Sequence, residues 1–242
     1  MRRHVVRHLG LVLVVLLGMG IAGCGGLPEE ATEPAAPASL PGGGSAVPAD
    51  VAADPRPGPL LVVLGDSLTA GLGLDVDEAY PARLERALRN DGYALTVVNA
   101  GVSGDTTAAG LARAEWALAG DVRILVLALG GNDGLRGLPA DQMKRNLSQI
   151  LALAAERGIR VLLAGMEAPP NFGAAYTAEF RTVFEDLARE HEVAFLPFLL
   201  DGVAAHPALN QADGIHPNAA GASIVADLVR DALEPLLPAL VP

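Results

Sequence analysis

The distribution of apolar residues divides the chain into three stretches of different character. Residues 9–21 are continuously apolar or glycine, residues 25–59 contain scarcely a large apolar side chain, and from Leu60 onward short aliphatic runs alternate with helical patterns. The middle stretch is rich in Ala, Pro, Gly, Ser and Glu, so it cannot bury enough surface to fold. We therefore expect an N-terminal segment, a tether, and a folded domain that begins near Leu60.

Within the folded stretch, aliphatic runs alternate with apolar residues at helical spacing. The runs are typical of strands buried on both faces, and they cover 60–64, 95–98, 124–129, 159–164 and 193–196. Helices are predicted between and after them, over 78–90, 106–119, 139–157, 178–190 and 217–236. The alternation predicts an α/β fold with a five-stranded parallel sheet and helices on both faces. Functional residues should then follow the carboxyl ends of the strands.

The N-terminal segment has the features of an export signal. Three arginines within residues 1–8 precede an apolar run that is shorter than the ~20 residues needed to span a bilayer. The run ends Ile21-Ala22-Gly23-Cys24, which resembles the bacterial lipobox with Ile21 in place of Leu. We expect a signal peptide over 1–23, a lipidated Cys24 with a disordered tether over 24–59, and the folded domain over 60–242. An ordinary signal peptide with an incidental cysteine, or an uncleaved anchor, are the alternatives.

Composition and charge narrow the class of protein. The chain has 242 residues, 51% of them hydrophobic, which suffices for one sizeable α/β domain. Its formal net charge of −11 opposes binding to the phosphate backbone of a nucleic acid. Cys24 is the only cysteine, so no intrachain disulfide forms, and no Cys/His cluster has metal-ligand spacing.

Four polar blocks follow the predicted strands and together supply the parts of an acyl-transfer site. Each block alone is an ordinary turn sequence. Ser67 offers a nucleophile after the first strand, His216 offers the base that such a hydroxyl needs, and Asp213 lies three residues before His216, where it could orient the imidazole. The backbone N–H groups of Ser67 and Gly104 and the amide of Asn132 are candidate donors to the tetrahedral oxyanion.

These blocks resemble those of the GDSL, or SGNH, hydrolases, which are named for the Ser, Gly, Asn and His of four motifs. The motifs here are GDSL at 65–68, NAGVSGD at 99–105, GGND at 130–133 and DGIHP at 213–217. They are most similar to the subgroup of bacterial acyl-CoA thioesterase I, lysophospholipase L1 and arylesterases. The resemblance implies a flavodoxin-like three-layer α/β/α fold, and it implies no metal and no organic cofactor.

The resemblance also implies a substrate class. In the related thioesterases a loop after the fourth strand helps to form the acyl groove, and the loop over 166–180 carries Pro169, Phe172 and Tyr176, which we expect to contact substrate. We expect hydrolysis of small esters, thioesters or lysophospholipids through an acyl-Ser67 intermediate. We further expect a monomeric domain, anchored through Cys24 to the periplasmic side of a bacterial envelope; Gly25, which is not acidic, favours the outer membrane. Deacetylation of envelope polysaccharide, or acyl binding without turnover, are the alternatives.

Other residues with reactive side chains are not expected to take part in the chemistry. Ser103 lies in a near match to the nucleophile elbow of α/β-hydrolases, but Asp105 stands where that pattern needs glycine. His206 has no acidic neighbour close in sequence, and His191 ends a predicted helix, where a cation suits the helix dipole. Asp66 is expected to order the turn at Ser67, with no chemical step assigned to it.

Overall fold

The structure, a computed structural model, describes residues 58–237, so the expected signal peptide, Cys24 and all but the end of the tether lie outside the described residues. Its centre is a parallel sheet of five strands in the order β2-β1-β3-β4-β5. This order places β1 between β2 and β3, and β1 pairs in parallel with both of them. The strands are β1 (Leu60–Gly65), β2 (Thr96–Gly101), β3 (Val122–Ala128), β4 (Arg160–Ala164) and β5 (Ala194–Leu196).

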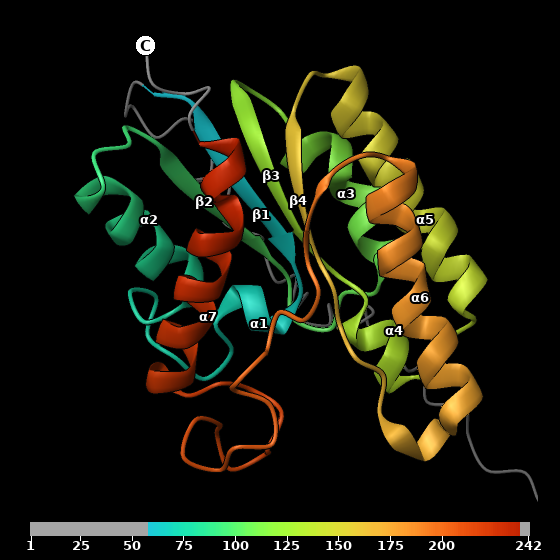
Figure 1. The fold of residues 1–242 in the computed structure, drawn as a ribbon. Coiled ribbons are helices and arrows are strands. Elements are labelled where there is room, and N and C mark those ends of the chain that lie inside the picture. Colours follow the sequence, from blue (N-terminus) through green and yellow to red (C-terminus); the bar gives the residue numbers. More distant parts are fainter. Residues whose placement is uncertain (1–57, 238–242) are drawn as a thin grey trace, which may run out of the picture. The chain divides into compact units, whose positions relative to one another are not determined.

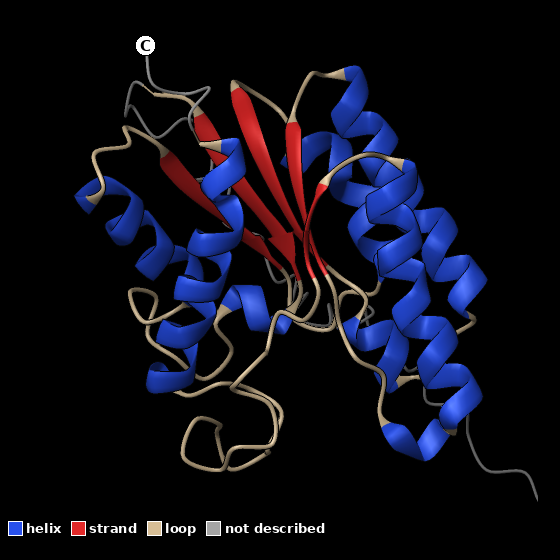
Figure 2. Ribbon diagram, in the orientation of Figure 1, coloured by secondary structure: helices blue, strands red, loops and turns tan. Residues whose placement is uncertain are grey.

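Helices cover both faces of the sheet, which confirms the predicted three-layer α/β/α architecture (Figures 1 and 2). Helices α2 and α7 pack on each other over one face, while α3, α5 and α6 pack together over the other. The helices are α1 (Ser67–Ala70), α2 (Tyr80–Asn90), α3 (Thr107–Ala117), α4 (Gly131–Leu135), α5 (Ala140–Glu156), α6 (Ala174–Glu190) and α7 (Ala219–Leu233), with 3₁₀ turns η2 (Pro170–Phe172) and η3 (Glu234–Leu236).

The apolar pattern explains these layers. The central strands β1 and β3 are aliphatic at nearly every position, and almost all of their side chains are buried because helices lie against both faces. Each large helix instead buries one stripe: in α2 the buried stripe includes Tyr80, Leu84 and Leu88. Among residues 58–237, no helix is both long enough and apolar enough to cross a bilayer.

Several predicted boundaries were wrong. The helix predicted from residue 178 begins at Ala174, because Tyr176, Phe180 and Phe184 at i, i+4, i+8 continue one helical face. The last helix starts two residues late, at Ala219, and gives way at Glu234 to a 3₁₀ turn that contains Pro235. Helices α1 and α4 were missed and taken as turns, because segments of four and five residues are too short to display a helical period.

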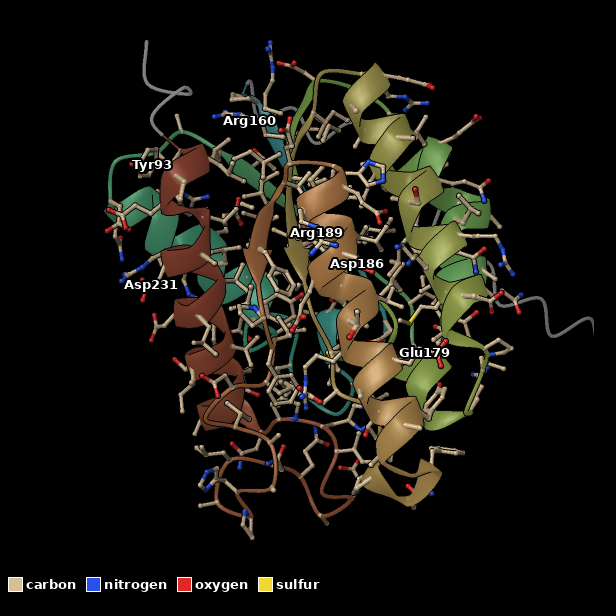
Figure 3. All side chains as sticks on the ribbon, turned by 45° about the vertical axis from the view of Figure 1, so that its right-hand side comes forward. Tyr93, Arg160, Glu179, Asp186, Arg189 and Asp231 are labelled. Carbon is tan, nitrogen blue, oxygen red and sulfur yellow. The ribbon has the colours of Figure 1, made fainter. Side chains whose placement is uncertain are left out.

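All five strands end at one edge of the sheet, and this edge carries the polar blocks. Helix α1 follows β1 there, α4 follows β3, and the long connection over 197–218 returns there before α7 (Figure 1). Arg160, the first residue of β4, lies at the opposite end of the strands (Figure 3). The placement agrees with the expectation that ligands bind beyond the carboxyl ends of parallel strands.

Candidate active site

Ser67 is the first residue of α1 and is held tightly against the end of the sheet. Asp66 caps this helix, its carboxylate accepting the Leu68 N–H at 3.0 Å. Two glycines permit the close packing: a Cβ on Gly65 would lie 2.0 Å from the Thr69 hydroxyl, and one on Gly101 would lie 2.2 Å from the Ala70 nitrogen. The position of the serine is therefore fixed by backbone contact with both β1 and β2.

A continuous hydrogen-bonded chain joins Ser67, His216 and Asp213. The Ser67 Oγ lies 2.9 Å from His216 Nε2, and His216 Nδ1 lies 2.6 Å from Asp213 Oδ2. The other carboxylate oxygen of Asp213 accepts the backbone N–H groups of His216 and Ile215. These backbone hydrogen bonds, with the one from the imidazole, lower the pKa of Asp213 to about 2, so it is a carboxylate near neutral pH.

Asn132 is held by a buried acid. Its Nδ2 donates to Asp66 Oδ2 at 3.2 Å, and Asp66 is only 3% exposed. Burial raises the pKa of Asp66 to about 6, against the lowering effect of the hydrogen bonds from Leu68 and Asn132. An amide nitrogen carries two hydrogens, so the bond to Asp66 leaves one N–H of Asn132 for another acceptor.

Helix α4, which carries Asn132, is tied to the start of α3. Asp133 is 2% exposed and accepts two bonds from Thr107, one from its N–H at 2.8 Å and one from its hydroxyl at 2.7 Å. Asn146 of α5 donates to the same Thr107 hydroxyl. This satisfied buried network fixes α4 against two longer helices.

Two arginines hold the Gly104 loop beside these groups. Gly104 has a φ of +87°, in the left-handed region that glycine adopts without strain, and its carbonyl accepts from Arg136 Nη2 at 2.9 Å. Arg113 bridges Asp105 and the Gly65 carbonyl, at 2.7 and 3.0 Å. The loop after β2 is thus bonded both to α4 and to the end of β1, which brackets Ser67.

The hollow beside Ser67 is apolar and lies on the side of α1 and α7. It is shallow and open to solvent, and besides Ser67 and His216 it is lined by a mainly aliphatic set. That set is Leu68, Gly71, Leu72, Leu74, Tyr80, Leu200, Pro217, Ala222 and Val225.

Pro169, Phe172 and Tyr176, expected to contact substrate, do not line this hollow. Phe172 and Tyr176 stack at 5.5 Å between ring centroids, and the Tyr176 hydroxyl donates to the Leu138 carbonyl. Phe172 also packs against Gly137, where a Cβ would meet its ring at 2.6 Å. These aromatics form a second apolar surface, separate from the hollow, which packs against Gly137 and Leu138 after α4.

The rejected candidates stay apart from the hydrogen-bonded chain. Ser103 is exposed, and the histidine bonded to a serine at this edge is His216, not His206. His191 follows α6, and its Nε2 lies 2.9 Å from the Ser148 hydroxyl, a packing contact between α6 and α5.

Sequence reasoning missed the contacts of Asp66, Arg113 and Arg136. Asp66 was expected to order the turn at Ser67, and it does cap α1 there. Its hydrogen bond from the Asn132 amide was not expected. Only the contact of Asp66 could have been found from the sequence. Asp66 and Asn132 both follow predicted strands, so the two residues are expected at the same edge of the sheet. The two arginines bond backbone carbonyls, and no pattern in the sequence specifies such partners.

Comparison with known proteins finds relatives that match most of the folded domain. The sequence profile of the GDSL-like Lipase/Acylhydrolase family matches residues 63–224. Esterase TesA of Pseudomonas aeruginosa is 43% identical over 178 residues, which cover 73% of this chain and 89% of that protein. Thioesterase 1/protease 1/lysophospholipase L1 of Escherichia coli K12 is 38% identical over 178 residues, covering 73% of this chain and 84% of the relative.

A solved structure agrees with the fold. The crystal structure of AlinE4, an SGNH-hydrolase family esterase, superposes with a TM-score of 0.63 at 44% identity. The match covers 76% of this chain and 98% of AlinE4. AlinE4 consists of little more than this region, and the residues of this chain that the structure describes form a hydrophobic core of their own.

Proposed function

Because the chain belongs to the GDSL-like lipase/acylhydrolase family, we propose that it hydrolyses carboxylic esters or thioesters through an acyl-Ser67 intermediate. The observation that carries the proposal is the unbroken chain from Ser67 Oγ through His216 to Asp213, with distances of 2.9 and 2.6 Å. A serine nucleophile is activated when its hydroxyl is hydrogen-bonded to an imidazole that is itself hydrogen-bonded to a carboxylate.

In the acylation half, Ser67 Oγ attacks the carbonyl carbon while His216 Nε2 accepts the hydroxyl proton. The imidazolium that forms is stabilised by Asp213, which stays ionised because its pKa is about 2. The carbonyl oxygen becomes an oxyanion, which accepts from the N–H groups of Ser67 and Gly104 and from the N–H of Asn132 that does not face Asp66. When the intermediate collapses, His216 returns its proton to the departing alcohol or thiol.

In the deacylation half, a water molecule takes the place of the leaving group. His216 removes its proton as the oxygen attacks the acyl carbon, and the same three donors hold the second oxyanion. Collapse breaks the bond to Ser67 Oγ, which recovers its proton from His216, and the free carboxylic acid leaves. In every step a proton moves either to or from His216, and the direction alternates from one step to the next.

The apolar hollow at Ser67 and the second apolar surface after α4 support an ester with apolar substituents. The names of the relatives point the same way, since one is an esterase and another a thioesterase and lysophospholipase. The aromatic row at Phe172 and Tyr176 suits an acyl chain, and the aliphatic hollow near His216 adds further apolar surface. We assign the enzyme to small esters and lysophospholipids rather than to acetylated polysaccharide, whose polar sugar would gain little from aliphatic walls.

The location proposed for the enzyme rests on the sequence alone. Residues 1–23 are assigned as a signal peptide, Cys24 as the acylated residue, and residues 24–59 as a tether to the envelope. A lysophospholipid is a substrate that an anchored enzyme would meet at the membrane. Labelling cells with radioactive palmitate would test this, since label on the wild type and none on Cys24→Ala is the expected result.

The function is tested with nitrophenyl esters from acetate to palmitate and a fragment of residues 25–242. We expect Ser67→Ala to lose at least ~10⁴-fold in kcat, while Ser103→Ala, which removes the other serine at this edge, stays close to wild type. Equal rates for wild type and Ser67→Ala across the series would reject the proposal. A profile that falls steeply beyond acetate would favour the acetylesterase alternative.

A further inference from the structure

The exposed apolar side chains of the domain gather at the end that carries Ser67. In the part of the chain that the structure describes, seven large apolar side chains are exposed, and six of them lie in segments that follow the carboxyl ends of strands. Scattered exposed apolar residues need no explanation, but a concentration at one end does. We call these six the apolar rim; they are Leu72, Val76, Val102, Leu135, Phe172 and Ile215.

The rim residues come from five different segments that follow the carboxyl ends of strands. Gln211, in the long connection before α7, donates to the Leu72 carbonyl at 2.7 Å. Arg136, next to Leu135, donates to the carbonyl of Gly104, two residues after Val102. These bonds join four of the segments in two pairs, and Phe172 packs against Gly137, two residues after Leu135.

Resting on the proposed function, we propose that the apolar rim docks the domain on a zwitterionic phospholipid surface, so that ester substrates reach Ser67 from that surface. Val76 shows the chemistry most plainly: it is 88% exposed, in a loop between α1 and α2. An aliphatic side chain at this exposure gains free energy when it enters the acyl boundary of a lipid layer.

The charges on the same loop decide which lipid surface fits. Asp75, Asp77 and Glu78 flank Val76. Acids so close to the inserting side chain repel anionic headgroups, whereas the outermost charge of a zwitterionic headgroup is a cationic ammonium. The surface is therefore one of zwitterionic lipid, and anionic lipid should weaken the docking.

The length of chain before the domain allows this orientation. The tether joins β1 at its amino end, and a six-residue strand separates that end from the site by ~20 Å. Full extension limits the chain from Cys24 to Pro59 to a span of ~120 Å. Because this limit far exceeds ~20 Å, an anchor at Cys24 would leave enough chain for the rim to reach the membrane that holds it.

The test is flotation of the 25–242 fragment with vesicles, which removes the anchor and leaves the rim. With phosphatidylcholine vesicles we expect wild type and Ser67→Ala to bind equally, and Val76→Ser to bind about tenfold more weakly. The matched control is Trp116→Ser: Trp116 is 60% exposed but lies near the end of α3, away from the rim. This control should bind like wild type.

Two further measurements complete the experiment. Replacing part of the phosphatidylcholine by phosphatidylglycerol should weaken binding. Val76→Ser should lose activity on vesicle-bound lysophosphatidylcholine while keeping its rate on soluble nitrophenyl acetate. No binding by wild type, equal binding by Val76→Ser, an equal loss in Trp116→Ser, or stronger binding to the anionic vesicles would overturn the proposal. The failure of the proposed function can be told from the failure of the docking proposal. If wild type binds the vesicles but hydrolyses no ester, the proposed hydrolase function is rejected and the docking of the apolar rim is retained.

Discussion

Replacing Asp66 by Asn should reduce activity without reducing stability, a combination that a merely structural residue would not give. In the wild type, one Asp66 oxygen accepts from the Leu68 N–H and the other from Asn132 Nδ2. An asparagine at 66 must keep its oxygen on Leu68, so its own amide nitrogen would face that of Asn132. The Asn132 amide would then turn over and present its oxygen, not an N–H, to the oxyanion.

The expected size of each effect follows from the geometry and the pKa. Loss of one oxyanion donor costs about 10²–10³ in kcat. The stability change has the opposite sign. The folded-state pKa of Asp66 is raised from 3.8 to about 6, so the ionised carboxylate costs stability as pH rises through that window, up to about 3 kcal/mol above pH 6. Asp66→Asn escapes this loss, so its stability relative to wild type should rise by about 2 kcal/mol between pH 4 and pH 7.

Two assays decide the matter. The kcat for nitrophenyl butyrate at pH 8 reports the oxyanion donor, and urea unfolding at pH 4 and pH 7 reports the linkage. Asp133→Asn is the matched control, since this equally buried acid bonds Thr107 and not the Asn132 amide. It should lose stability at both pH values. If Asp66→Asn kept its kcat within threefold, or if its relative stability did not change with pH, the reasoning would be refuted.

Two other substitutions probe the rest of the site. Asp213→Asn removes the charge that stabilises the His216 imidazolium and should lower kcat about 10⁴-fold with little loss of stability, as steady-state kinetics beside a thermal melt would record; an effect below tenfold would mean that His216 does not depend on it. Gly101→Ala places a Cβ 2.2 Å from the Ala70 nitrogen, so it should displace α1, cost about 1–3 kcal/mol and lower kcat ~100-fold. Gly92→Ala, with a φ of +91° but no atom within 4 Å, should cost stability alone; equal activity losses in the two variants would contradict this account.

The layers of the fold were predictable because they follow from patterns that the sequence repeats. The run from Leu61 to Leu64 is typical of a strand buried on both sides, and the parallel order of such strands places the polar blocks at one edge. The segments that failed were short or lacked a period. Helix α1 packs against Gly65, which is too near in sequence to form a pattern, and against Gly101, which is distant in sequence. Its four residues therefore looked like a turn.

The candidate site was predictable as a set of residues but not as a network. Ser67, Asp213 and His216 follow from their chemistry and their places after strands, and the distances agree with that grouping. The bond of Asp66 to Asn132 joins residues 66 positions apart, and no spacing rule specifies it. The apolar hollow was missed for the same reason, because its lining combines α1, α7 and the connection between β5 and α7.

The buried acid explains why the two halves of the site need each other. In the proposed mechanism the hydrogen-bonded chain through His216 generates the attacking oxygen, but it does not hold the charge that the attack creates. That charge depends on Asn132, whose amide has two faces of opposite character and no intrinsic preference between them. Asp66 sets that preference from the residue next to the nucleophile, at the cost of a carboxylate buried to 3% exposure. Because burial raises the pKa of Asp66 to about 6, stability is lost as pH rises from about 4 through 6, and we attribute this loss to the positioning of the Asn132 amide.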